Sequence, residues 1–139
     1  MPEVNEWNRR MIEEFRANKG RVGGMWEGRP LLLLTTTGAK SGQHRTNPVM
    51  YMHEGDHLYI FASKGGAPTN PDWYHNLLAH PDVTVEIGDE KLKATAKPVT
   101  GKVRDTIYAK WAEMYPQFHE YQEKTTRKIP VIELESRKA

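Results

Sequence analysis

The chain has 139 residues, of which 37% are hydrophobic and 27% are charged, enough to bury one core and too few for two ordinary domains. Its 20 basic and 18 acidic residues leave a formal charge of +2, which argues against a nucleic-acid-binding protein. The sequence contains no cysteine, which excludes disulfides, thiolate metal sites and a cysteine nucleophile. We therefore expect one domain over residues 1–139.

The first segment, residues 1–20, is expected to form an amphipathic helix over about 4–18. One helical face carries the apolar side chains Val4, Trp7, Met11, Ile12 and Phe15. We expect this helix to pack on the domain; the alternative is that it lies on the inner face of the cell membrane, near a lipid-soluble substrate. Because no stretch resembles a signal peptide or a membrane span, we expect a soluble, cytoplasmic protein.

The rest of the chain is expected to alternate strands, tight turns and helices. Hairpin signals at residues 54–56 and 88–90 favour antiparallel pairing, and such a sheet can close into a barrel. The apolar and β-branched patterns predict strands near 30–37, 46–53, 57–63, 82–88, 90–98 and 129–135, and helices near 70–79, 101–114 and 117–125.

The first loop with chemical potential follows the apolar run that begins at Leu31, and reads TTTGAKSGQHR over residues 35–45. Glycines that free the backbone, hydroxyl donors, Lys40 and Arg45 together suit a phosphate or a carboxylate. The loop is not a P-loop, because Ala39 precedes Lys40 and a strand follows where a Walker helix would begin. The alternative is a solvated hairpin turn without a ligand.

A second loop follows the third predicted strand, in ASKGGAPTNPDWYHNLLAHPDV over residues 62–83. Asn70 and Pro71 predict a helix start, with Asn70 as the cap and Pro71 at the first helical position. Free N–H groups at that helix start, beside Trp73, suit a flat ring with polar edges. The alternative is that Trp73 and Leu77 form the buried stripe of a short helix.

These two loops, together with MYPQFHEYQEKTTRKIPVIEL near the end, resemble the deazaflavin-dependent nitroreductase family of actinobacterial oxidoreductases. The resemblance extends over about residues 28–135. It implies an α+β fold, an antiparallel split β-barrel of about six strands of the flavin-binding type with flanking helices. It also implies coenzyme F420, an 8-hydroxy-5-deazaflavin with a phosphate and an oligoglutamate tail. The reaction implied is hydride transfer to a flat, apolar acceptor such as a quinone, with nitroaromatics as further candidates.

The resemblance also assigns roles to individual residues. It places the phosphate and acidic tail at Lys40, Ser41 and Arg45. The deazaflavin ring is assigned to Pro48, Ser63, Lys64, Gly65, Gly66, Ala67 and Trp73, and the cofactor-binding set also includes Asn47, Val49 and Ala62. The acceptor is assigned to Met50, Tyr115, Phe118 and Tyr121, with Tyr121, Tyr115 and Ser63 as the catalytic residues that hydrogen-bond or polarise it.

Two positions depart from the family pattern. Phe118 lies where the nitroimidazole-reducing members have a tyrosine, and Met50 occupies an aromatic position. Both changes remove polar or aromatic contacts, which disfavours nitroimidazole reduction and leaves quinone reduction as the expected activity. For Phe118, ordinary core packing is an equally good explanation.

Other functions stay open at this point. An FMN-binding split-barrel oxidoreductase would use the same barrel, and a non-catalytic protein that binds the cofactor or a lipid would need no proton donor. A homodimer is a further possibility. We predict no metal site, because a hairpin turn separates His53 from His57 and prevents the helical spacing that converges two imidazoles.

Overall fold

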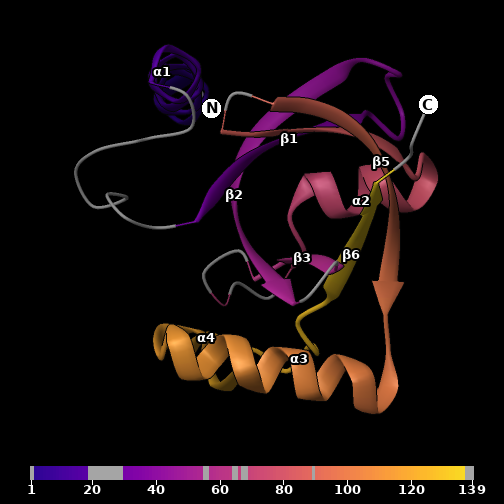
Figure 1. Cartoon of the computed structure of the whole chain (residues 1–139). Helices are drawn as coiled ribbons and strands as arrows, with labels where there is room; N and C mark the ends of the chain where they lie inside the picture. The colour runs from indigo at the N-terminus through magenta and orange to yellow at the C-terminus, as the bar shows by residue number, and fades with distance from the viewer. Residues whose placement is uncertain are drawn as a thin grey trace.

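The computed structural model describes residues 2–18, 30–54, 57–63, 66, 69–88 and 90–136, with residues 2–8 and 136 described by their backbone alone. In this part of the chain, six strands form a closed barrel in the order β1-β2-β3-β6-β5-β4 (Figure 1). All neighbouring strands pair antiparallel. The structure therefore confirms the predicted antiparallel barrel with flanking helices.

The elements follow the predicted order closely. The strands are β1 (Leu31–Thr37), β2 (His44–Glu54), β3 (His57–Phe61), β4 (Asp82–Ile87), β5 (Glu90–Val99) and β6 (Val131–Ser136), and the helices are α1 (Pro2–Ala17), α2 (Asp72–Ala79), α3 (Gly101–Met114) and α4 (Gln117–Lys124). Both predicted hairpins form, since Glu54 pairs with His57 and Ile87 pairs with Glu90. The largest boundary differences are two residues, at the starts of α1, β2, α2 and β6 and at the end of β3.

The interior of the barrel explains why β1 begins with four leucines. Leu32 and Leu34 point inward and belong to the central cluster, the group of buried side chains inside the barrel that also contains Ile60, Val85 and Ile132. Leu31 and Leu33 point outward and lie beneath α1. A strand covered on both faces is apolar throughout, instead of alternating apolar and polar residues. Trp73 and Leu77 of α2 join the same central cluster, so α2 packs against the inner-facing side chains of the barrel.

Helix α1 packs on the outside of the barrel, as expected. Met11 and Phe15 are 6% and 1% exposed and contact Leu31 and Leu33 of β1. Arg16 donates two hydrogen bonds to the carboxylate of Glu86 on β4, at 3.0 and 2.8 Å. The barrel covers Met11 and Phe15, which are therefore not available to a membrane surface, and the side chains of Val4 and Trp7 lie outside the described residues. None of the helices described is long and apolar enough to cross a membrane.

The ion pair between Arg16 and Glu86 makes the attachment of α1 dependent on pH. The hydrogen bond from Arg16 lowers the pKa of Glu86 below its usual value of 4.5. A carboxylate with a lowered pKa in the folded state stabilises the fold above its unfolded pKa, and this stabilisation is lost as the pH falls through the folded value.

We expect Glu86→Gln to lower the free energy of unfolding by about 1 kcal/mol at pH 7. The effect is small because the Arg16 side chain is 52% exposed and water screens its charge. Denaturant unfolding at pH 7 and pH 3 measures the effect, which should shrink at the lower pH. Glu135→Gln is the matched control, because the Glu135 side chain is 56% exposed beside Lys97 and its pair should contribute little. An equal loss in both variants would contradict this account.

Helices α3 and α4 lie beneath the barrel in Figure 1, and they pack against each other through Trp111 and Phe118. They cover the outward side chains Met52, Tyr59, Phe61 and Val131 of β2, β3 and β6. Met50 of β2 is half-buried and contacts both this cluster and the cluster under α1. The outer face of β2 around Met50 therefore lies between α1 and the α3–α4 pair.

Candidate functional site

The first predicted loop is an exposed hairpin that joins β1 to β2. The N–H of Gly38 donates to the carbonyl of Gln43 at 2.7 Å, and the N–H of Gly42 donates to the carbonyl of Gly38 at 3.0 Å. Gly42 has a φ of +72°, which L side chains rarely adopt. Lys40, Ser41 and Arg45 are all exposed. The loop is thus the hairpin turn that the sequence allowed, with two cations presented to solvent.

The hydroxyls around this hairpin are partly occupied by contacts within the protein. Thr35 and Thr46 share a hydrogen bond of 2.7 Å between their Oγ1 atoms, and Ser41 Oγ accepts the N–H of Gln43 at 3.1 Å. A serine oxygen that accepts one bond keeps its own O–H as a donor. Arg45 Nη2 donates to Gln43 Oε1 at 3.3 Å, which uses one of its several N–H donors. Lys40, Arg45 and the Ser41 hydroxyl are the groups of this hairpin best placed to receive an anion.

Asn76 of α2 fixes the hairpin to the segment that follows the second loop. Its Oδ1 accepts the N–H of Ala39 at 3.0 Å, and its Nδ2 donates to Thr36 Oγ1 at 3.2 Å. Because α2 begins directly after the second loop, this residue links the two predicted loops through one helix. The sequence did not indicate a role for Asn76, because a single asparagine within the DWYHNLLA helix forms no recognisable motif.

The second loop reaches α4, where the acceptor residues were predicted. Gly66 is buried, has a φ of +82°, and its N–H donates to the carbonyl of Ser63 at 2.9 Å. A Cβ placed on Gly66 would lie 2.9 Å from the carbonyl oxygen of Tyr121 and 3.0 Å from its Cα. The backbone of this loop therefore packs directly on the backbone of α4. Lys64, Gly65 and Ala67 lie outside the described residues.

Arg127 binds both ends of this second loop. Its contact with Asn70 shows that the predicted helix cap was wrong. Its Nη1 donates to the Ala62 carbonyl at 3.1 Å and to Asn70 Oδ1 at 2.7 Å, and its Nη2 donates to the Ser63 carbonyl at 2.6 Å. Asn70 is thus not the cap of α2; Pro71 occupies the cap position and no side chain caps the helix. The prediction failed because a guanidinium far along the chain takes up the amide oxygen that local capping would have used.

The predicted ring residues on β2 and around the second loop divide between two environments. Ala62 is fully buried, and Trp73 is 8% exposed in the central cluster beside Leu77, as the buried-stripe alternative described. Successive residues of β2 alternate in direction. Val49 packs against the central cluster, with Asn47 on the same side, whereas Met50 faces the outer clusters, with Pro48 on its side. Pro48 and Met50 are both half-buried.

The predicted acceptor residues form one aromatic group under the barrel. Phe118 is 5% exposed and packs edge-on against Tyr121 at 5.1 Å between ring centroids and against Trp111 at 5.2 Å. Tyr115 lies 4.6 Å from Trp111, and both Tyr115 and Tyr121 are half-buried. Phe118 is therefore a core residue, while Tyr115, Tyr121 and Met50 are half-buried and pack against the same cluster of buried side chains.

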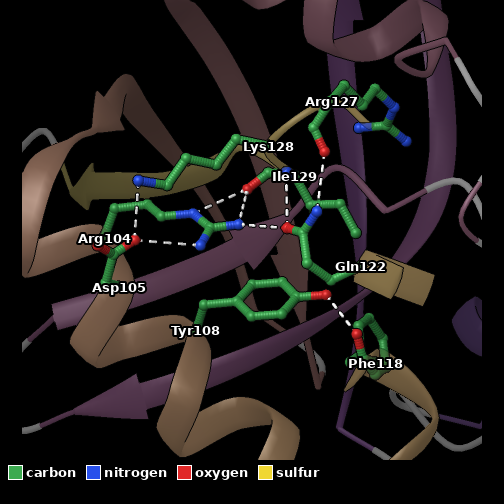
Figure 2. Close-up of polar contacts among 8 residues, drawn as sticks. All are labelled: Arg104, Asp105, Tyr108, Phe118, Gln122, Arg127, Lys128 and Ile129. Carbon is green, nitrogen blue, oxygen red and sulfur yellow. Dashed lines mark hydrogen bonds and ion pairs between the residues drawn. The ribbon is translucent and has the colours of Figure 1, made fainter. Parts of the chain in front are cut away.

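Behind this group, a network of polar contacts that the sequence did not reveal joins α3 to α4. The Arg104 side chain, which is 9% exposed, donates from Nε and Nη2 to the Ile129 carbonyl at 3.0 and 2.6 Å, and from Nη2 to Gln122 Oε1 at 2.9 Å (Figure 2). Burial raises the pKa of Tyr108 to about 12, which keeps its phenol protonated as it donates to the Phe118 carbonyl at 2.6 Å. These hydrogen bonds attach α3 to α4 and to the segment before β6.

The chain is similar in sequence to known proteins. Residues 7–136 match the family described as F420H(2)-dependent quinone reductase. An F420H(2)-dependent quinone reductase of Mycobacterium tuberculosis is 43% identical over 129 residues, which cover 88% of this chain and 85% of the relative.

Two solved structures extend the comparison. One, described as an F420-H2 dependent reductase, has 45% identity and a TM-score of 0.70, and the match covers 77% of this chain and 95% of that chain. A second, described as a domain-swapped dimer, has 41% identity and a TM-score of 0.72, and the match covers 96% of this chain and 98% of that chain.

Proposed function

Because this chain belongs to the F420H(2)-dependent quinone reductase family, we propose that it reduces quinones with reduced coenzyme F420 between its second loop and α4. The chain is an oxidoreductase that uses coenzyme F420. The resemblance to the deazaflavin-dependent nitroreductases indicated a related family, and the match to the quinone reductases corrects that assignment. Quinones are accordingly the acceptor class, with other flat, apolar molecules as candidates.

The observation that carries the proposal is the contact between Gly66 and the backbone of Tyr121. This contact supports a shared site, because it sets the loop assigned to the cofactor directly beside the helix assigned to the acceptor. Hydride transfer requires the two reacting molecules to be adjacent and correctly oriented.

The residues present suit coenzyme F420 at both of its ends. The exposed cations Lys40 and Arg45, with the Ser41 hydroxyl, match a phosphate and carboxylate tail. The half-buried surface of Pro48, Met50 and the two tyrosines matches a flat ring and a flat acceptor. Ala62 and Trp73 are buried and support the residues that would contact the cofactor. The proposed cofactor set is completed by Asn47, Val49, Ala62, Ser63, Lys64, Gly65, Gly66, Ala67 and Trp73.

In the proposed mechanism, the bound cofactor supplies the hydride and the protein supplies position and a proton donor. Met50, Tyr115 and Phe118 exclude water from the acceptor. The Tyr121 hydroxyl donates a hydrogen bond to the acceptor oxygen that gains negative charge, which stabilises that charge in the transition state. Tyr115 and Ser63 are the further polar groups at this surface. The chain therefore needs no covalent nucleophile.

The test is anaerobic mixing of the protein with reduced F420 and a soluble naphthoquinone, followed through the absorbance of the oxidised cofactor. We expect cofactor oxidation that depends on both protein and quinone. Arg45→Met should weaken cofactor binding by about tenfold or more, because a hydrogen bond between charged groups contributes roughly 1.5 to 3 kcal/mol. Lys91→Met is the matched control, since Lys91 is an exposed cation on β5 that pairs with Glu86, at the end of the β1–β4 ladder away from Arg45.

Three other outcomes would contradict the proposal. Tight binding of FMN in preference to F420 would support the flavin-dependent alternative. Binding of F420 without oxidation by any quinone would support a non-catalytic carrier. Equal F420 affinity in the Arg45 and Lys91 variants would remove the assignment of the first loop to the acidic tail.

The proposal includes a homodimer, supported by the relative described as a domain-swapped dimer. Light scattering should then give about twice the 16.0 kDa mass of one chain. A mass of one chain at micromolar concentration would count against this part of the proposal.

A further inference from the structure

Arg127 is not one of the predicted cofactor or acceptor residues. It lies between α4 and β6, and its side chain reaches back across the fold to Ala62, Ser63 and Asn70, at the two ends of the second loop. The partners are two backbone carbonyls and one side-chain amide oxygen, which are separated from Arg127 by 57 to 65 positions in the sequence. A planar guanidinium with several fixed donors suits such a bridge, because one group meets several acceptors at once.

The backbone of Arg127 is held as firmly as its side chain. Its carbonyl accepts Gln122 Nε2 at 2.8 Å, and its N–H donates to Thr125 Oγ1 at 3.3 Å. Figure 2 shows that the carbonyl of Arg127 faces Gln122 while its guanidinium points away from Arg104. One residue therefore joins the loop on one side and helix α4 on the other.

Gln122 is in turn fixed by partners on both sides. Its Oε1 accepts Arg104 Nη2 at 2.9 Å and the N–H of Ile129 at 3.0 Å. Tyr121, the proposed proton donor, immediately precedes Gln122 on α4. The contacts of Gln122 thus hold the helix segment that carries Tyr121 and the segment that carries Arg127 in one arrangement.

We propose that Arg127 is a positioning residue of the cofactor site, which holds both ends of the second loop in the shape that receives the deazaflavin beside α4. The inference rests on the proposed function and adds to it a residue that acts through the loop ends it binds. Without Arg127, the Ala62 and Ser63 carbonyls lose a charged donor and the loop samples other shapes. If the binding shape falls to about one tenth of the population, the apparent affinity falls tenfold.

The experiment compares Arg127→Met, Arg127→Lys and the matched control Lys128→Met in the full-length protein. Lys128→Met removes the neighbouring charge, and the Lys128 side chain is 59% exposed and paired with Asp105 instead of the loop. Affinity for oxidised F420 is measured by fluorescence titration at a temperature where circular dichroism shows each variant folded. We expect at least tenfold weaker binding for Arg127→Met, an intermediate value for Arg127→Lys, and a change within twofold for Lys128→Met.

Hydrogen exchange separates positioning from general stability. In Arg127→Met, exchange should rise in peptides that contain residues 62–70, including the Gly66 amide, and stay unchanged in β1, β4 and β5. Folded Arg127 variants that bind F420 within twofold of the wild type, or whose exchange rises throughout the barrel, would overturn the inference. If Arg127→Met does not fold, a loss of threefold or more in Arg127→Lys supports it and a smaller loss overturns it.

The wild-type titration distinguishes this failure from failure of the proposed function. A wild-type protein that does not bind F420 overturns the proposed function and the inference together. A wild-type protein that binds F420, with unchanged binding in both Arg127 variants, overturns the inference alone.

Discussion

Gly66→Ala should both destabilise the fold, by about 3 kcal/mol, and weaken F420 binding by more than tenfold. The backbone of Gly66 has a φ of +82°, a region that costs an L residue roughly 1 to 2 kcal/mol. The added Cβ would also lie 2.9 Å from the Tyr121 carbonyl oxygen and 3.1 Å from the Lys124 Cβ. Overpacking of this kind costs roughly a further 1 to 3 kcal/mol, because backbone must move. Denaturant unfolding and a fluorescence titration measure the two effects.

Gly101→Ala is the matched control for this prediction. Gly101 also has a positive φ, +65°, but a Cβ placed there meets nothing within 4 Å. Gly101→Ala should lower the free energy of unfolding only by the cost of the positive φ, and it should leave the affinity for F420 unchanged. If the two variants lose equal stability and bind F420 equally, the close approach of the loop to α4 does not matter to the site.

Tyr121→Phe is the second change with a large expected effect, and it acts on catalysis instead of folding. The ring that packs edge-on against Phe118 is retained, so the free energy of unfolding should change little. Loss of the hydroxyl removes a donor to the developing negative charge, a change that typically lowers kcat by about a hundredfold, or roughly 2.7 kcal/mol. Steady-state rates with reduced F420 and a naphthoquinone measure it, and F420 affinity should be unchanged.

Two further variants make this result specific. Tyr115→Phe should have the smaller effect on kcat, since the Tyr115 ring packs at a tilt against Trp111, whereas the backbone of Tyr121 contacts the second loop. Tyr74→Phe removes a phenol hydroxyl on α2, beside the central cluster, and should leave kcat unchanged. An unaltered kcat in Tyr121→Phe, with normal cofactor binding, would rule out the proton-donor role.

Local patterns were sufficient to predict most of the fold. The strands, the helices and both tight hairpins depend on residue alternation, helical periodicity and turn residues, all of which act over a few positions. The four leucines of β1 predicted a strand, and the structure shows that both of its faces are covered. Composition within one loop also indicated an anion near Lys40, Ser41 and Arg45, the residues proposed for the acidic tail, and the structure places all three at the surface.

The candidate site was less predictable where it depends on contacts between distant segments. Asn70 has the sequence of a helix cap, yet its amide oxygen accepts a hydrogen bond from Arg127, 57 positions later. Asn76, Gln122 and Arg104 carry no motif, because a single polar side chain that bridges two elements has no periodic pattern to display. Trp73 suited both a ring site and a core, and its 8% exposure places it in the core beside Leu77.

The sequence by itself determined the order of the elements, the antiparallel pairing through tight hairpins and the loops that carry glycine and positive charge. Only the tertiary structure decided which loop lies against α4, which side chains of β2 face the outer surface, and which guanidinium holds the loop ends. The physical reason is the separation along the sequence over which each kind of interaction acts. Propensities and turn chemistry act between near neighbours, whereas the contact of Gly66 with Tyr121 and the bonds of Arg127 form only once the barrel closes and brings remote segments together.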